Sequence, residues 1–406
     1  MPITLRQNSP KHRAYVIGAW ALAALAIVFV TFAYELPWVP FSLDQGFRIS
    51  QINEVVAYAV AILGLNLVIG YSGQLSLGQS AFVGLGAYTT IILVSDYNWS
   101  YFSTIPVSAA ICFVVGLIIG LPALRISGLY LAIVTLGLAY VFPTIVLRFD
   151  WLTGGPNGKK PDRGSGELNP PSWMPFSDAG RLASPLWVYC ILIVMALVLF
   201  VGARNFIKSG PGRGLIAVRD NPTSASISGV NTPINKMTAF GLAGAYGGLA
   251  GTMLMMTRPF ASDIQFGLNL AIFLVVGLVA GGAGTISGAV PGAFIYVFVP
   301  YFISQWTQDQ SGMPPGLQQV TKPLFNWLED RQGAGAISGV FFGAGLLLFV
   351  FLLPGGFIAG MRKLRARVVQ VIPNPTWLSD VERDTGQHIE IEDAPDLPDA
   401  SVVTSS

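Results

Sequence analysis

The sequence predicts an all-α, polytopic membrane protein with about ten transmembrane segments. Composition is the first observation behind this prediction. Charged residues make up only 11% of the chain, hydrophobic residues make up 52%, and the mean hydropathy is +0.60, values far from those of soluble domains. The second observation is a series of charge-free runs, each long enough to cross a hydrocarbon core about 30 Å thick. The third is the clustering of basic residues in a few of the polar segments between these runs.

The charge-free runs define ten predicted spans. In chain order these are 14–34, 52–71, 79–95, 104–122, 126–147, 185–204, 237–257, 266–282, 287–306 and 338–354. No small-residue cleavage site follows the first run, so we interpret it as a span and not as a removed signal peptide.

Two of the runs are too long for a single crossing. Residues 55–95 carry no charge and would extend about 60 Å as one helix at about 1.5 Å per residue. We therefore expect a reversal at 70–80, where glycines break the helix and polar side chains satisfy the freed backbone groups. The run 264–308 is divided in the same way at 281–288. The loose similarity of these two Gly-rich segments leaves an internal repeat open.

Three basic segments define the predicted orientation: the N-terminus, the central segment 209–236 with its flanks, and 362–367. Six predicted spans separate the first from the second, and four separate the second from the third. Because both numbers are even, all three lie on one side, which their Lys and Arg content marks as cytoplasmic. The chain then divides into a cytoplasmic N-terminus (1–13), a transmembrane domain (14–367) and an acidic, disordered cytoplasmic tail (368–406).

The central segment 209–236 is predicted to lie at the membrane surface. After Gly-Arg-Gly, an amphipathic helix is predicted over about 215–228, with Gly229 as its C-terminal stop. A short helix lying flat on one membrane face provides a surface for a partner subunit. Arg213, Arg219 and Asp220 are its candidate contact residues. The alternative is that these arginines only hold the loop on the cytoplasmic side.

Polar residues of the first reversal are candidates for a translocation pathway. They are Ser72, Gly73, Gln74, Ser76, Gln79 and Ser80. Irregular backbone at membrane depth is tolerated where protein or a water-filled cavity surrounds it, and half-helix ends suit a zwitterionic solute. The alternative is a turn between two ordinary spans. Thr135, inside a predicted span, joins the candidates, although hydroxyls and amides such as Asn66 at mid-span more often form interhelical hydrogen bonds.

The segment 152–158, Leu-Thr-Gly-Gly-Pro-Asn-Gly, ends a span on the predicted outer side. Thr153, Gly154, Gly155 and Asn157 are candidates for an external gate or for a lip on which another protein docks. An ordinary Pro-Gly turn is the equal alternative.

Several function classes lack support in the sequence. The two histidines, His12 and His388, lie in the polar termini, so neither a catalytic site nor a metal site is predicted. Cys112 and Cys190 fall in apolar runs and are interpreted as inert thiols. The ATP-binding pattern G-x-x-x-x-G-K-[ST] does not occur. The spans hold no acid or base of the kind that ion-coupled carriers use, since Glu54 lies at a span boundary. Energy supplied by another polypeptide is the simplest account.

Five segments together carry a family resemblance. They are GYSGQLSLGQSAFVGLGAY at 70–88, RISGLYLAIVTLGLA at 125–139, LTGGPNG at 152–158, GRGLIAVRDN at 212–221 followed by Gly229, and VGLVAGGAGTISGAVPGA at 276–293. In this order they resemble the LivM-type permease subunits of ABC importers for branched-chain amino acids. The chain departs from the family pattern at Gln79, where a His is common, and at Pro222-Thr223, near where an acidic residue is usual.

The resemblance implies an ABC importer permease in the bacterial cytoplasmic membrane, with both termini cytoplasmic. It implies no ATPase activity in this chain and no cofactor of its own, since ATP and Mg would be bound by two cytoplasmic ATPase subunits. A second, LivH-like permease subunit and an extracytoplasmic solute-binding protein complete the expected partners. Membrane lipid surrounds them, and no nucleic acid is expected. The segment 209–236 would be the loop that docks on an ATPase. A urea or short-amide permease is one alternative, and a stand-alone channel or facilitator is another.

Overall fold

The computed structural model describes residues 3–6, 46–126, 128–161, 168–174, 183–308, 356–361 and 369–372. The chain forms two compact units, one made of Met1–Val28 with Arg362–Ser406 and one made of Phe29–Met361. The predicted spans at 14–34 and 338–354, both histidines and most of the acidic tail lie outside the described residues.

The first unit contains a short pair of parallel strands. β1 (Ile3–Arg6) pairs with β2 (Val369–Ile372), with Ile3 opposite Val369 and Arg6 opposite Ile372. The prediction of a disordered segment is therefore wrong for 369–372. The physical reason is local, because Val-Gln-Val-Ile is rich in the β-branched residues that favour strands.

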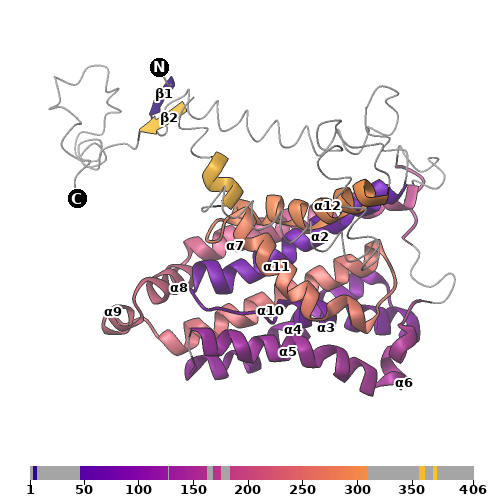
Figure 1. Ribbon diagram of the computed structural model, residues 1–406, viewed down its shortest axis with the longest axis horizontal. Helices are drawn as coiled ribbons and strands as arrows, with labels where there is room; N and C mark the ends of the chain where they lie inside the picture. Colours follow the sequence, from indigo (N-terminus) through magenta and orange to yellow (C-terminus); the bar gives the residue numbers. More distant parts are fainter. Residues whose placement is uncertain are drawn as a thin grey trace. The chain divides into compact units, whose positions relative to one another are not determined.

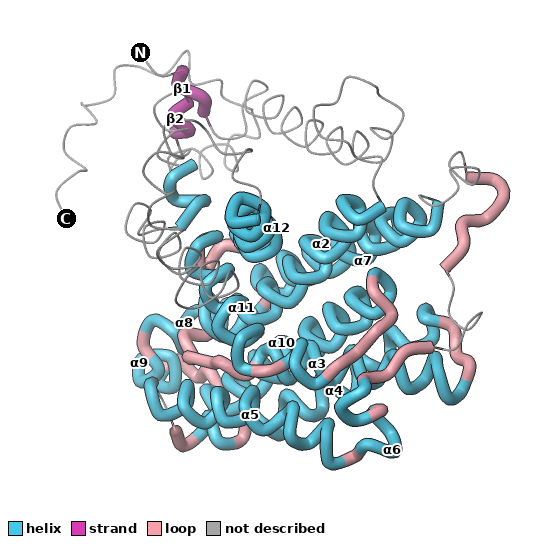
Figure 2. The backbone as a smooth tube through the Cα atoms, turned by 45° about the vertical axis from the view of Figure 1, so that its right-hand side comes forward, coloured by secondary structure: helices cyan, strands magenta, loops and turns pink. Residues whose placement is uncertain are grey.

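The second unit is a bundle of long helices (Figures 1 and 2). They are α2 (Gly46–Asn66), α3 (Gln79–Tyr97), α4 (Tyr101–Gly120), α5 (Leu129–Arg148), α7 (Ala183–Lys208), α10 (Thr232–Thr257), α11 (Leu268–Gly281) and α12 (Ala289–Gln308). Each predicted span from 52–71 to 287–306 corresponds to one of these helices. Within the described part, six helical segments are long and apolar enough to cross a membrane. The protein is thus an α-helical, multi-pass membrane protein.

Both predicted reversals are confirmed. α2 continues into a π-helical turn, Leu67–Tyr71, and the chain is then non-helical until α3 begins at Gln79. In the second reversal, α11 is followed by Gly282, which has φ +118°. The chain then enters α12 through a 3-10 turn, Ile286–Gly288. The conformation at Gly282 favours glycine because a Cβ crowds the backbone there.

α10 begins earlier than predicted. The sequence places its start at about 237, but the structure starts it at Thr232. Asn231 caps the helix by accepting a hydrogen bond from the backbone N–H of Ile234 at 3.1 Å, and Pro233 fits the first turn, where its missing N–H costs nothing. Polar residues that look like loop are helical because a cap precedes them.

α10 lies at the centre of the bundle and packs against α2, α3 and α4. Its small residues let the neighbouring backbones approach closely. A Cβ on Gly244 would lie 2.2 Å from Cys112 O in α4, and a Cβ on Gly251 would lie 2.1 Å from Val83 O in α3. Cys112 itself is a buried, free thiol at this contact, and Cys190 is free and partly buried. The high glycine content thus has a direct structural use.

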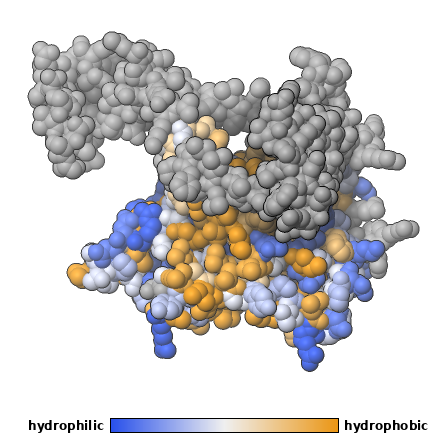
Figure 3. All heavy atoms as spheres, in the orientation of Figure 1, coloured by the Kyte–Doolittle hydropathy of each residue, from blue (hydrophilic) through white to orange (hydrophobic). Residues whose placement is uncertain are grey.

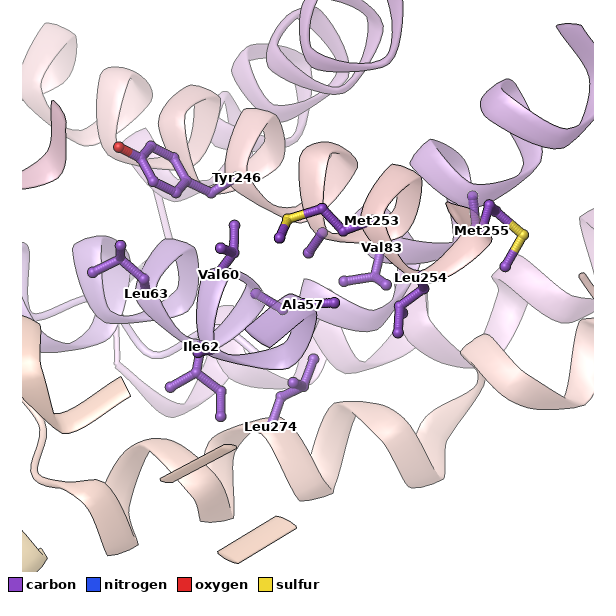
Figure 4. Close-up of a cluster of buried hydrophobic side chains, with 14 of the residues drawn as sticks. Ala57, Val60, Ile62, Leu63, Val83, Tyr246, Met253, Leu254, Met255 and Leu274 are labelled. Atoms are coloured by element: carbon purple, nitrogen blue, oxygen red, sulfur yellow. The ribbon is translucent and has the colours of Figure 1, made fainter. Parts of the chain in front are cut away.

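α2 lies between α10 and α11, as the buried side chains in Figure 4 show. Val60 points toward α10, and Ile62 points toward α11 and Leu274. All three side chains are fully buried. Since α2 is covered on both sides, its position depends on both neighbours.

The outer surface of the bundle is apolar over its middle. In Figure 3, hydrophobic residues gather over the centre of the visible face and polar residues over its two ends. Exposed Ile, Val and Leu side chains are frequent on α4, α5 and α7. An apolar band between two polar ends is the pattern of a bundle surrounded by lipid or by another membrane subunit.

Candidate functional site

Two short helices occupy most of the central polar segment. α8 (Gly210–Asp220) follows α7, and α9 (Pro222–Ile227) follows α8. Figures 1 and 2 place both at one end of the bundle, with α6 (Asp150–Thr153) at the other. We call α8 and α9 together the α8–α9 pair.

The predicted single helix over 215–228 is wrong at its start and in its middle. It begins at Gly210, because Ser209 is extended and Pro211 fits the first turn. It breaks at Asn221, which precedes Pro222 and is extended, with φ −156° and ψ 105°, since a residue before proline disfavours the helical region. The side-chain oxygen of Asn221 then caps α9 by accepting hydrogen bonds from two backbone N–H groups, both at 3.0 Å.

Gly229 as the helix stop is confirmed. It has φ +83°, the left-handed conformation in which helices commonly end at glycine. Its backbone N–H bonds Ser226 O at 3.1 Å, so the end of α9 keeps a hydrogen-bonded turn.

α8 is held tightly against the ends of α7 and α10. A Cβ on Gly212 would lie 2.1 Å from Phe206 O in α7, and a Cβ on Gly214 would lie 2.8 Å from the Asn235 side-chain oxygen in α10. Leu215 is fully buried beside them. A force on α8 therefore reaches two long helices directly.

The three candidate contact residues of this pair differ in their surroundings. Arg213 is exposed and donates to Lys208 O at 2.8 Å. Arg219 forms an ion pair with Asp220, 2.9 Å between Nη2 and Oδ1, and the two side chains are 39% and 61% exposed. Arg219 also donates from Nη1 to Gly70 O at 2.9 Å. The Arg213 bond reaches the last residue of α7, and the Arg219–Gly70 bond reaches the end of the π-helical turn that follows α2.

The pathway candidates of the first reversal are mostly buried inside this chain. Ser72, Gln74, Ser76, Gln79, Ser80 and Thr135 are each less than 9% exposed, whereas Gly73 is exposed. Their role as pathway residues stays a prediction. Gln74 Oε1 and Ser80 Oγ are buried and have no hydrogen-bond partner within the described residues.

Gln79 joins three helices. Its Nε2 group donates to Ala61 O in α2 and to Ala243 O in α10, both at 3.1 Å. Thr135 of α5 holds the same reversal from the other side, because its hydroxyl oxygen accepts from the backbone N–H of Leu77 at 2.9 Å. Both side chains thus bond backbone groups of neighbouring segments.

The two Gly-rich reversals meet at Asn66. Asn66 is fully buried; its Nδ2 donates to Thr285 O, and its Oδ1 accepts from the N–H of Gly284, both at 2.8 Å. A Cβ on Gly70 would lie 2.5 Å from Gly284 N, so the two backbones are in direct contact. We call Asn66, Gly70, Gly73, Arg219, Gly284 and Thr285 the glycine junction.

The candidates at the other end form an ordered turn. The Thr153 hydroxyl donates to Val146 O at 2.7 Å, and Gly154 and Gly155 have φ +82° and +56°. Asn157 is exposed. These features fit a Pro-Gly turn built on the end of α5, and the gate or docking role stays a prediction.

This turn is fastened to the loop that follows α10. Lys159 and Ala261 exchange both backbone hydrogen bonds, at 2.8 and 2.9 Å, and Lys159 Nζ pairs with Asp96 at 2.6 Å. Burial alone raises the pKa of the Asp96 carboxyl, but the Lys159 ammonium and the Ser95 hydroxyl outweigh it and lower that pKa. Sequence reasoning missed Lys159 and Ala261, since a contact between distant loops leaves no local pattern.

A second ion pair lies near this end. Glu54 Oε1 of α2 and Arg258 Nε, directly after α10, are 2.6 Å apart, with side chains 17% and 52% exposed. The sequence treats Glu54 as a boundary residue, but it lies inside the helical segment 49–71. Its partner, distant in the sequence, makes the charge tolerable there.

Comparison with known proteins gives the family. The family described as "Branched-chain amino acid transport system / permease component" matches residues 47–352. The chain belongs to this family. The match contains the α8–α9 pair, the glycine junction and every other candidate site residue.

Two curated relatives carry the same description in their names. The high-affinity branched-chain amino acid transport system permease proteins LivM of Escherichia coli K12 and of Salmonella typhimurium LT2 are each 31% identical to the chain over 259 residues. That alignment covers 60% of this chain and 60% of each relative. No solved structure matches significantly.

Proposed function

We propose that the chain is the permease subunit of an ATP-driven ABC importer that carries branched-chain or similar small neutral amino acids. Membership in the transport permease family supports the general role. The α8–α9 pair supports the proposed role of an ATPase. It consists of two short helices at one end of the bundle, and α8 packs on the ends of α7 and α10. Its exposed residues Arg213, Arg219 and Asp220 form the proposed contact with an ATPase.

α10 is the proposed path for movement between the two ends of the bundle. It is continuous over Thr232–Thr257, and at about 1.5 Å per residue its 26 residues extend about 39 Å. One end touches α8 through Asn235. The loop beyond the other end pairs with Lys159, beside the turn at 153–157, which we call the outer turn. Displacement of α8 by an ATPase would then shift the outer turn, as rigid-body alternating access requires.

The buried polar groups of the first reversal are the proposed contacts for solute. Gln74 Oε1 and Ser80 Oγ are buried acceptors without a partner in the described part of the chain. In a hydrocarbon-facing bundle such groups are costly unless something bonds them. The ammonium group of an amino acid is a suitable donor. Gly73, Ser72, Ser76, Gln79 and Thr135 shape the same region.

The proposed assembly contains four further subunits, of three kinds, around this chain. A second, LivH-like permease subunit completes the membrane part, and two ATPase subunits bind ATP and Mg on the cytoplasmic side. A solute-binding protein docks on the opposite side, where Thr153, Gly154, Gly155 and Asn157 form the outer turn. Both termini and the α8–α9 pair are cytoplasmic, and 14–367 forms the transmembrane domain.

Uptake of radiolabelled leucine by vesicles that contain the complete transporter tests this function. We expect uptake to require ATP and the ATPase subunits, and to stop when 213–229 is replaced by a Gly/Ser linker in a chain that still folds. Uptake that persists without any ATPase would indicate a stand-alone facilitator. Uptake of urea or a short amide in place of leucine would indicate a urea or short-amide permease.

A further inference from the structure

At the glycine junction, α8 contacts the first Gly-rich reversal and lies close to the second. Arg219 approaches it from the last turn of α8 and makes two kinds of contact. Its guanidinium donates to Gly70 O at 2.9 Å. Its aliphatic part lies on Gly73, where a Cβ would come within 2.6 Å of Arg219 Cγ. The side chain is therefore held both by a hydrogen bond and by packing.

Gly70 O is a suitable acceptor because of its position. It lies in the π-helical turn that ends α2, and the last carbonyl groups of a helix lack partners within the helix. A positively charged donor at a helix C-terminus is favoured by the helix dipole as well as by the hydrogen bond. Arg219 thus completes the end of α2 from a different helix.

Asn66 connects the same end of α2 to the second reversal. It uses both functions of its amide, donating to Thr285 O and accepting from Gly284 N–H, each at 2.8 Å. A carboxylate lacks the donor, and an apolar side chain lacks both groups. Gly284 also lies near Arg219, since a Cβ on it would come 3.7 Å from Nη1. One arginine and one asparagine therefore link three segments that are distant in the sequence.

We propose that Arg219 and Asn66 are positioning residues that make the end of α2 and the turn at 282–285 move together with α8. This inference rests on the proposed function, in which an ATPase displaces α8. It assigns the transmission step to the hydrogen bonds Arg219–Gly70 and Asn66–Gly284/Thr285. Arg219 acts through its inward contact with the reversal, in addition to any contact that its exposed part makes with an ATPase.

Two variants disrupt the contact between Arg219 and the first reversal. One changes α8, and the other changes the reversal. Arg219→Gln removes the guanidinium, and Gly73→Ala places a Cβ against the arginine stem while leaving every residue of α8 unchanged. The control is Arg204→Gln, because Arg204 is an exposed arginine of α7 outside the α8–α9 pair and outside the junction. The control removes the same charge near the same end of the bundle.

The experiment uses the full chain assembled with its ATPase, second permease and binding-protein subunits in vesicles. Three quantities are measured: co-purification of the ATPase, ATP hydrolysis, and leucine taken up per ATP hydrolysed. We expect Gly73→Ala, which leaves the proposed ATPase contact unchanged, to keep the ATPase and its hydrolysis. Both junction variants are expected to transport about tenfold less leucine per ATP hydrolysed, as expected for losing a charge-assisted hydrogen bond. Arg204→Gln is expected to stay within about twofold of the unaltered transporter.

Hydrogen exchange of the peptide 276–293 gives a second readout. Nucleotide binding is expected to change its exchange in the unaltered protein and in Arg204→Gln, but not in the two junction variants. If Arg219→Gln fails to fold, transport per ATP and hydrogen exchange in Gly73→Ala decide the test.

The inference is overturned if both junction variants transport like the control. It is also overturned if Arg219→Gln releases the ATPase while Gly73→Ala transports normally, because Arg219 would then act only as a docking residue. Failure of the proposed function looks different, since the unaltered chain would then transport without any ATPase.

Discussion

The contact between α3 and α10 gives the sharpest test of how this bundle is held together. Gly86 of α3 faces Gly248 of α10, and a Cβ on Gly86 would lie 2.2 Å from Gly248 O and 2.4 Å from its Cα. Both are backbone atoms, which no side-chain rotation can move away. Gly86→Ala is therefore expected to separate the two helices.

The size of the effect follows from these distances. An ordinary contact between such atoms is about 3.5 Å, so the 2.2 Å approach falls short by about 1.3 Å. Overpacking of this kind costs about 1–3 kcal/mol. The higher helix preference of alanine over glycine offsets up to about 1 kcal/mol of this cost. Gly86→Ala is therefore expected to lower the free energy of unfolding despite the better helix former.

Gly137→Ala is the matched control. Gly137 also lies inside a helix, α5, but a Cβ there meets nothing within 4 Å. This variant gains helix preference without a clash. Because both variants gain that preference, their unfolding free energies are expected to differ by the overpacking cost alone, about 1–3 kcal/mol. Unfolding of the full-length chain in detergent, titrated with a denaturing detergent, measures both. Equal stability of Gly86→Ala and Gly137→Ala would refute the close-packing argument.

Three other perturbations have defined outcomes. Gln79→Leu removes two interhelical hydrogen bonds, each worth about 0.6 kcal/mol in a membrane protein, so the same titration should show a loss of about 1 kcal/mol; unchanged stability with altered solute selectivity would contradict this and place Gln79 in the pathway. In Lys159→Cys/Ala261→Cys, the two Cα atoms should be about 5.5 Å apart, a distance that suits a disulfide. Oxidation should leave leucine uptake intact, because the movement of α10 is proposed to reach the outer turn through this pair. Uptake that stops on oxidation and returns on reduction would show instead that the outer turn must move relative to the α10 loop. Glu54→Gln should cost about 1 kcal/mol, because Arg258 is half exposed and such pairs are weak, and the exchange Glu54→Arg/Arg258→Glu should recover part of the loss; a double-mutant cycle without coupling would argue against the pair.

Sequence reasoning succeeded where the physical signal is local. Spans follow from charge-free length, the reversals follow from Gly-rich segments inside runs too long for one crossing, and Gly229 follows from the rules for helix ends. It failed where a single residue changes the backbone course. The break at Asn221 needs the effect of Pro222 on its neighbour, and the early start of α10 needs the cap at Asn231. Both signals are present in the sequence, and the apolar pattern alone overlooks them.

The composition and order of the residues by themselves determined that this chain is a multi-pass helical membrane protein, where its described helices lie and which polar segment is presented at its surface. These properties depend on transfer of each segment into lipid, which is set by the segment alone. Only the tertiary structure decided that Arg219 bonds Gly70, that Asn66 joins the two reversals and that Lys159 pairs with Ala261. Each of these contacts joins groups far apart in the chain, so its energy exists only after the helices have packed.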